Sequence, residues 1–143
     1  MTATPVVNRL RAITVRQPWA RCIAIGRKTV ENRTRPTSYR GPVAIHAAVA
    51  HSVDGLTDRR VTSLFGADPT LGQPRGAVIA VAELVDCHPA DGCCLPWGDP
   101  TGHHLVLDAA VLLADPVPAR GALGLPWRLD EATTLAVLGQ VKG

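Results

Sequence analysis

The segment from Gly76 to Cys87, GAVIAVAELVDC, constrains the fold most, because it reads as one long strand in the middle of the chain. Valine and isoleucine recur along it, and β-branched side chains pack well on a pleated sheet. Its two acids, Glu83 and Asp86, come late in the run. This segment predicts that the protein is organised around strands.

The remainder of the chain divides into further short strands and few helices. A helix opens at Gln17-Pro18, since proline is well tolerated in a first turn, and ends at Gly26. Gly41-Pro42 is predicted to form a turn. Further strands are expected at 10–16, 29–33, 43–48, 103–113 and 125–129, helices at 51–65 and 131–141, and irregular loops at 68–76 and 88–102. This pattern predicts a mixed α+β fold, mainly β, in the form of a small barrel.

Length and composition indicate one domain spanning residues 1–143. The chain has 143 residues, of which 46% are apolar, enough for a single hydrophobic core. No apolar stretch approaches the roughly 20 residues that cross a bilayer. Residues 1–12 lack the apolar core of a signal peptide, so we expect a cytoplasmic protein with no membrane partner.

Positive charge is concentrated at the start of the sequence. Residues 1–43 contain nine cations and a single acid, Glu31, whereas residues 44–143 contain six cations and eleven acids. Thirteen of the fifteen cations are arginine, whose planar fork suits phosphates and base edges. The asymmetry favours an anionic partner such as a nucleic acid; the alternative is a solvated basic face that binds nothing in particular.

Four cysteines raise the question of a metal site. Cys87, His88, Cys93 and Cys94 lie within eight residues, but structural zinc sites usually show paired C-x2-C spacing. Adjacent cysteines on an extended chain also point to opposite faces. We therefore predict incidental thiols in a loop, kept reduced together with Cys22, with neither a metal nor a cofactor.

Several ordered motifs resemble the ASCH domain, a family of the PUA-like superfamily. The matching segments are ITVRQPWA at 13–20, GRKTVENR at 26–33, YRGP at 39–42, IHA at 45–47, GAVIA at 76–80, VDC at 85–87 and RGALGL at 120–125. The resemblance covers about residues 10–129. It implies a PUA-like small β-barrel of five or six strands flanked by helices, with a basic cleft beside the first helix.

The resemblance also implies an RNA, nucleotide or nucleoside partner, although activity differs among family members. Some relatives act as ribonucleases, and a shorter bacterial branch removes the acetyl group of N4-acetylcytidine with a lysine, a threonine and a glutamate. Lys28 matches the motif lysine, but Glu31 stands where that branch has threonine, and Thr29 would not occupy the same place. The nucleophile of any such reaction therefore stays open.

Lys28 and Glu31 are the first catalytic candidates. Lys28 could neutralise a phosphate or, if desolvated, act as a base, because burial lowers the pKa of an ammonium group. Glu31 faces the opposite way on a strand unless the chain turns near Thr29. The alternative is an exposed Lys28 at a helix–strand junction, with Glu31 paired to Arg33 or Arg40.

The aromatic candidates are Trp19 and Tyr39. Trp19 either stacks on an unpaired base or anchors the first helix in the core. Tyr39 lies in a loop bounded by proline and glycine, where its ring could stack or its hydroxyl could donate a proton as a third catalytic candidate. Its alternative role is to cover the mouth of the barrel.

The remaining candidates are polar side chains for nucleic-acid binding. Arg16 and Gln17 can bond base edges, and we expect Arg16 to face the ligand and Gln17 to have a structural role. Phosphate contacts are predicted for Lys28, Arg33, Arg35, Arg40 and Arg120. Two hypotheses follow: an RNA-binding module without catalysis, and a metal-independent hydrolase acting on RNA or a modified nucleoside.

Overall fold

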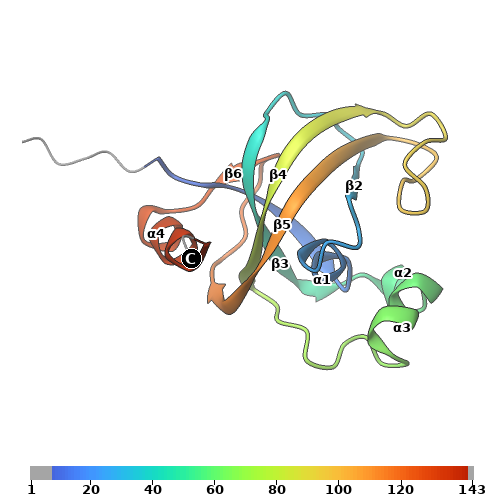
Figure 1. The fold of residues 1–143 in the computed structure, drawn as a ribbon, viewed down its shortest axis with the longest axis horizontal. Coiled ribbons are helices and arrows are strands. Elements are labelled where there is room, and N and C mark those ends of the chain that lie inside the picture. Colours follow the sequence, from blue (N-terminus) through green and yellow to red (C-terminus); the bar gives the residue numbers. More distant parts are fainter. Residues whose placement is uncertain (1–7, 142–143) are drawn as a thin grey trace, which may run out of the picture.

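A computed structural model describes residues 8–141 and shows one curved sheet with helices on both faces (Figure 1). The strands are β1 (Arg11–Gln17), β2 (Val30–Arg33), β3 (Gly41–His51), β4 (Ala77–Pro89), β5 (His103–Pro118) and β6 (Trp127–Arg128). The helices are α1 (Trp19–Ala24), α2 (Val53–Leu56), α3 (Arg59–Phe65) and α4 (Glu131–Val141). The first twelve residues, discussed above for a signal peptide, lie mostly outside the described range.

The six strands form a single sheet in the order β2-β5-β4-β3-β1-β6. β1 and β3 are parallel, and every other neighbouring pair is antiparallel. Register shifts interrupt the β4–β5 ladder at three places, and such bulges bend and twist a sheet. Within residues 8–141 no pairing joins β2 to β6, so the described strands form an open sheet and the predicted barrel is not closed.

Side chains alternate between two hydrophobic clusters on opposite faces of the sheet. Ile13 and Val43 point to the face that α1 covers with Ala20, Ile23 and Ala24. On the other face, α4 contributes Val137 to a cluster that holds Ala12, Ala44, Trp127 and Leu129. Figure 1 shows the two helices on either side of the strands. None of the helices in the described range has the length and apolar character to cross a bilayer.

β3 and β5 are longer than the strands predicted at 43–48 and 103–113, because prolines were expected to end a strand and here they lie inside one. Pro42 lies inside β3, but β3 pairs with β1 only from Val43 onward, so one edge of β3 is open at Pro42. Pro118 ends β5 opposite Ala77, well beyond the segment that pairs with β2. A residue without an N–H is tolerated at such open edges. The predicted Gly41-Pro42 turn is therefore wrong, and β3 begins at Gly41.

The helix predicted at 51–65 is in fact two short helices, because Asp58 caps the start of the second one. α2 ends at Leu56, and Asp58 starts α3 by accepting a hydrogen bond from Arg60 N at 2.8 Å. Gly55 lies against the start of α1, since a Cβ there would meet Pro18 Cδ at 2.7 Å. α2 and α3 are thus placed next to Trp19.

Candidate functional site

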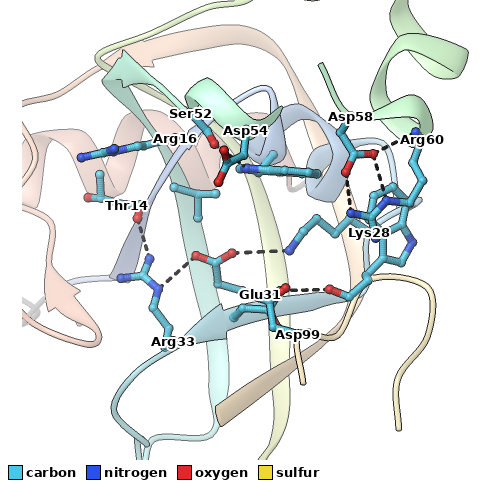
Figure 2. Close-up of a pocket in the computed structure, with 14 residues that line it drawn as sticks. Thr14, Arg16, Lys28, Glu31, Arg33, Ser52, Asp54, Asp58, Arg60 and Asp99 are labelled. Carbon is cyan, nitrogen blue, oxygen red and sulfur yellow. Dashed lines mark hydrogen bonds and ion pairs between the residues drawn. The ribbon is translucent and has the colours of Figure 1, made fainter. Parts of the chain in front are cut away.

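A cavity of about 480 Å³ lies between β1, the start of α1, β2, the α2–α3 segment and the loop at 90–102 (Figure 2). We call it the central pocket. Its lining consists of Thr14, Val15, Arg16, Trp19, Lys28, Glu31, Asn32, Arg33, Ser52, Asp54, Asp58, Arg60, Trp97 and Asp99. Its volume is within the range of pockets that bind small organic ligands.

A chain of charged groups crosses the central pocket from Lys28 to Arg33. Lys28 Nζ lies 3.5 Å from Glu31 Oε1, and Arg33 Nε donates to Glu31 Oε2 at 3.0 Å (Figure 2). Arg33 Nη2 also donates to the carbonyl oxygen of Thr14 at 2.5 Å. The carboxylate therefore joins two cations and fixes both in the pocket.

Lys28 and Glu31 lie on the same side because Lys28 stands outside β2 and Glu31 within it. Lys28 N donates to Cys22 O at 2.9 Å, so Lys28 lies beside the end of α1, and its Nζ donates to Val30 O at the first residue of β2. Because Lys28 precedes β2, which begins at Val30, the alternation of side chains along a strand does not separate it from Glu31. The alternative of an exposed Lys28 is wrong, whereas the Glu31–Arg33 pair forms.

Burial sets the electrostatics of the pair. Lys28 is 4% exposed and Glu31 is 8% exposed. Desolvation lowers the pKa of Lys28 below its ordinary value, and the neighbouring Glu31 carboxylate offsets part of that change. Lys28 is therefore a buried amine whose ion-pair partner among the described residues is the Glu31 carboxylate.

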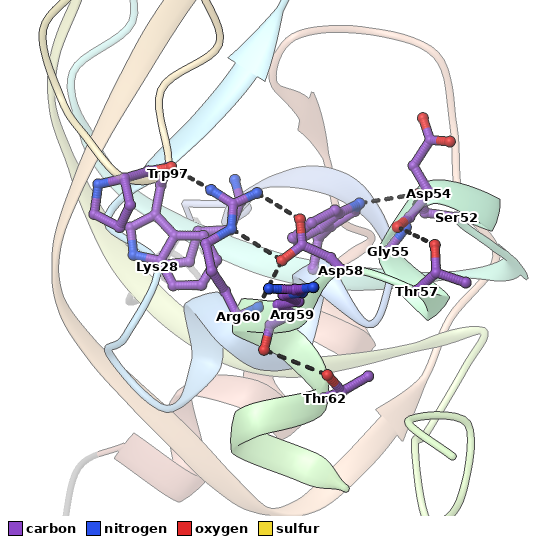
Figure 3. Close-up of polar contacts among 12 residues, drawn as sticks. Lys28, Ser52, Asp54, Gly55, Thr57, Asp58, Arg59, Arg60, Thr62 and Trp97 are labelled. Atoms are coloured by element: carbon purple, nitrogen blue, oxygen red, sulfur yellow. Dashed lines mark hydrogen bonds and ion pairs between the residues drawn. The ribbon is translucent and has the colours of Figure 1, made fainter. Parts of the chain in front are cut away.

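Arg60 lies beside Trp97 in the wall of the pocket next to Lys28 (Figure 3), and Lys28 Nζ is 5.8 Å from the Trp19 ring centroid. The Arg60 guanidinium carbon lies 4.7 Å from the Trp97 ring centroid and 5.7 Å from that of Trp19. The two rings meet edge to face, with centroids 6.5 Å apart. Trp19 Nε1 donates to Ser52 Oγ at 2.9 Å, which fixes the ring against α2. Trp19 is half-buried, packs against the core cluster under α1 and lines the pocket, and its stacking on a base stays a prediction.

Asp58 holds Arg60 in this position. Arg60 Nε donates to Asp58 Oδ1 at 2.9 Å and Nη2 donates to Oδ2 at 2.7 Å, a two-pronged pair. These bonds lower the pKa of Asp58. Arg60 Nη1 donates to Pro96 O, which ties the loop at 90–102 to α3. None of Arg60, Trp97 and Asp99 was among the predicted site residues.

The central pocket is not the basic cleft that was predicted. Its lining holds four cations, Arg16, Lys28, Arg33 and Arg60, and four acids, Glu31, Asp54, Asp58 and Asp99. A neighbouring cavity of about 350 Å³ shares Arg33 and adds Arg35, Thr34, Pro36, Gly124 and Leu125, with no acid. We call it the arginine cleft. The two cavities thus differ in charge. The central pocket has equal numbers of cations and acids, the arginine cleft has cations alone, and Arg33 lines both.

Several predicted site residues lie elsewhere. Gln17 is fully buried: its Nε2 donates to Pro74 O at 2.8 Å and its Oε1 accepts from Arg21 N at 3.0 Å, so it serves the structure and does not face a ligand. The Tyr39 hydroxyl donates to Pro42 O at 2.7 Å, away from Lys28. Arg40 lies 3.8 Å from Asp86. These three, together with the exposed Arg120, are not among the residues that line either cavity.

The structure corrects one premise used for the cysteine-rich loop, that its adjacent thiols point to opposite faces. Cys94 has a left-handed backbone with φ of 66°, so the chain is not extended there and both thiols turn to the same side. The fourth partner is His104 and not Cys87: the ligand atoms of His88, Cys93, Cys94 and His104 all lie within 4.8 Å of one another. This donor set could hold a metal ion.

Comparison with known proteins identifies the fold and the family. The family model described as the ASCH domain matches residues 13–97. Two crystal structures of an ASCH protein from Zymomonas mobilis, one of them a mutant with phenylalanine in place of a tyrosine, are similar with a TM-score of 0.55 and 16% identity. The alignments cover 92% of this chain in both cases, and 98% of the mutant and 94% of the other chain. No curated protein matched the sequence.

Proposed function

The chain belongs to the ASCH domain family, and from this premise we propose that it binds RNA by taking one unstacked nucleotide into the central pocket. ASCH domains are generally associated with nucleic acids. The observation that carries the proposal is the pairing of a charge-balanced pocket with an acid-free arginine cleft through Arg33. A base and its phosphate need those two environments.

The central pocket suits a base better than a phosphate. Its carboxylates can accept hydrogen bonds from exocyclic amines, and its arginine groups can donate to ring nitrogens and carbonyl oxygens. Trp19, Trp97 and Arg60 offer flat surfaces, and stacking on such surfaces contributes about 1–3 kcal/mol per base. With four acids among its lining residues, the same pocket disfavours a polyanionic backbone.

The arginine cleft suits the phosphate on the adjoining nucleotide. Arg33 and Arg35 both line it, and Arg16 is an exposed cation on the central pocket. Within residues 8–141 neither Arg16 nor Arg35 has an ion-pair partner, so both are available to an incoming phosphate. Of the predicted phosphate ligands, Arg16 and Arg35 therefore carry the proposal, while Lys28 and Arg33 are both engaged by Glu31.

A salt titration of a labelled single-stranded RNA tests this function. Each phosphate contact contributes about −0.7 to the slope of log K against log salt for single strands, so contacts at Arg16 and Arg35 predict a slope of about −1.4. Arg35→Ala should make the slope shallower by about 0.7, and the matched surface variant Arg40→Ala should leave it unchanged. The proposal is contradicted if the protein does not bind the RNA, or if its affinity for the RNA does not change with salt concentration.

A metal-independent hydrolase is the second candidate, favoured by the buried Lys28 beside Glu31. A lysine with a lowered pKa next to a carboxylate can exchange protons with a substrate. The nearby hydroxyls are engaged: Thr14 Oγ1 accepts from Trp127 Nε1, and Ser52 Oγ accepts from Trp19 Nε1. The nucleophile for ribonuclease or N4-acetylcytidine chemistry would then be water.

Product formation from RNA and from acetylated cytidine distinguishes the two candidates. A hydrolase releases product without added metal, and Lys28→Met, once shown to be folded, releases none. If the wild-type protein binds RNA but leaves both substrates intact, the binding function stands alone.

A further inference from the structure

The loop between β4 and β5 folds back on the two strands and gathers two thiols and two imidazoles. His88, near the end of β4, is the cross-strand neighbour of His104 in β5. Cys93 and Cys94 come from the loop and lie over this pair. Cys94 Sγ is 3.5 Å from His88 Nε2, and Cys93 Sγ is 3.9 Å from the same nitrogen and 3.7 Å from His104 Nδ1.

We propose that His88, Cys93, Cys94 and His104 bind one Zn²⁺ ion as a closed, tetrahedral, structural site. With Zn–S of about 2.3 Å and Zn–N of about 2.0 Å, a regular tetrahedron places sulfur and nitrogen about 3.5 Å apart and two sulfurs about 3.8 Å apart. The three sulfur–nitrogen distances already lie near that value. The two sulfurs, 3.1 Å apart, need to separate by about 0.7 Å.

Hydrogen bonds to backbone carbonyls prepare both imidazoles as ligands. His104 Nε2 lies 2.8 Å from Asp99 O, and His88 Nδ1 lies 2.9 Å from Pro89 O. A carbonyl oxygen only accepts, so the ring nitrogen facing it carries the proton. The other nitrogen, His104 Nδ1 or His88 Nε2, then presents its lone pair to the cluster, as is usual for histidine ligands of zinc.

The backbone around the cysteines is shaped to close the site. The N–H groups of Trp97 and Gly98 both donate to Cys94 O, at 3.2 and 2.8 Å, which turns the loop sharply after the thiols. Gly98 packs directly on the cluster: a Cβ there would lie 2.7 Å from His104 Cε1 and 2.9 Å from Cys93 O. A glycine at this position lets the loop approach His104.

Four protein ligands leave no open coordination position, so the ion has a structural role. Two thiolates and two imidazoles are the ligand types that select zinc among the common divalent metals. The site holds the loop that supplies Trp97 and Asp99 to the central pocket. Asn32 ties the same loop to β2 by donating to Trp97 O at 2.9 Å and accepting from Asp99 N at 2.8 Å. Metal binding would therefore stabilise one wall of the pocket.

Metal analysis of the full chain tests this site. Protein purified without chelator should contain about one zinc per chain, and the reduced, metal-free protein should take up one Co²⁺ with the intense visible absorption of tetrahedral thiolate coordination. Cys93→Ser and Cys94→Ser should each remove the thiolate-to-cobalt band or weaken it by about half. The matched control is Cys87→Ser, because Cys87 neighbours His88 but lies outside the cluster.

The wild-type measurement stands even if a variant fails to fold. A wild-type chain that contains no zinc and takes up no Co²⁺ after reduction overturns the proposal. So does a Cys93–Cys94 disulfide, seen as a loss of about two mass units, in protein that takes up no metal once reduced. Loss of the cobalt spectrum in Cys87→Ser with full retention in Cys93→Ser and Cys94→Ser places the metal elsewhere and also contradicts it. RNA binding is measured separately, so the two proposals can fail independently.

Discussion

Replacing Glu31 with glutamine tests whether its carboxylate holds Lys28 in the interior. The carboxylate lies 3.5 Å from Lys28 Nζ and 3.0 Å from Arg33 Nε, and Lys28 is only 4% exposed. Removing one partner of a buried ion pair leaves an uncompensated charge and costs about 3–5 kcal/mol. We expect Glu31→Gln to lower the free energy of unfolding by that amount at neutral pH.

The assay is urea denaturation followed by tryptophan fluorescence. With a urea dependence of about 1–3 kcal/mol per molar, the midpoint should fall by about 2 M. The control is Asp86→Asn, whose partner Arg40 is 3.8 Å away and whose carboxylate is 58% exposed; exposed pairs contribute about 0–1 kcal/mol. The double variant Lys28→Met/Glu31→Gln should recover most of the loss, because neither charge remains.

The loss of unfolding free energy in Glu31→Gln should become smaller as pH rises. Burial lowers the pKa of Lys28 from its ordinary value of 10.5, so the unfolded chain holds more protons and stability rises with pH through the window between the folded and unfolded values. Without Glu31 that pKa falls further. The difference between Glu31→Gln and the wild type should therefore narrow as pH rises. The reasoning is refuted if Glu31→Gln is as stable as Asp86→Asn. It is also refuted if the difference in unfolding free energy between Glu31→Gln and the wild type widens as pH rises.

Three further substitutions give separate tests. Gly98→Ala should lower the melting temperature because its Cβ would meet His104 and Cys93 O, whereas Gly139→Ala, with open space on α4, should raise stability by about 0.5–1 kcal/mol; equal effects in calorimetry contradict this. Thr14→Val removes the acceptor of Trp127 Nε1 at 3.1 Å and a bond to His46 at 3.2 Å, and should cost about 1–3 kcal/mol in urea denaturation; an unchanged midpoint refutes it.

Local signals were sufficient to predict most elements from the sequence. α4 has the predicted bounds, Glu131–Val141, and β1, α1 and β4 lie within a few residues of theirs. These segments have a clear period or a proline or glycine at their ends. β3 and β5 were predicted too short, because a proline that faces an open edge of the sheet does not end a strand. Which edge is open depends on pairing with strands that are distant in the sequence, so the sequence around the proline does not reveal it.

Only part of the central pocket could be predicted from the sequence, because the rest of its lining comes from segments that are far apart along the chain. Lys28, Glu31 and Arg33 are close in sequence, and their motif placed them together. Arg60, Trp97 and Asp99 come from a helix and a loop that meet β2 only in the folded chain. One signal was available: Asp58 two residues before Arg60 is a typical helix cap, and it divides the predicted helix at 51–65. The cysteine cluster needed His104, which only the β4–β5 pairing brings to Cys93.

Ultraviolet crosslinking of a short single-stranded RNA containing 4-thiouridine tests the central claim most directly. The base is predicted to lie in the central pocket, which Trp19 and Trp97 both line. Mass spectrometry of the crosslinked protein should therefore find the nucleotide on peptides that contain Trp19 or Trp97. Crosslinks confined to peptides around Tyr39 or Arg120, with none at either tryptophan, would contradict the account.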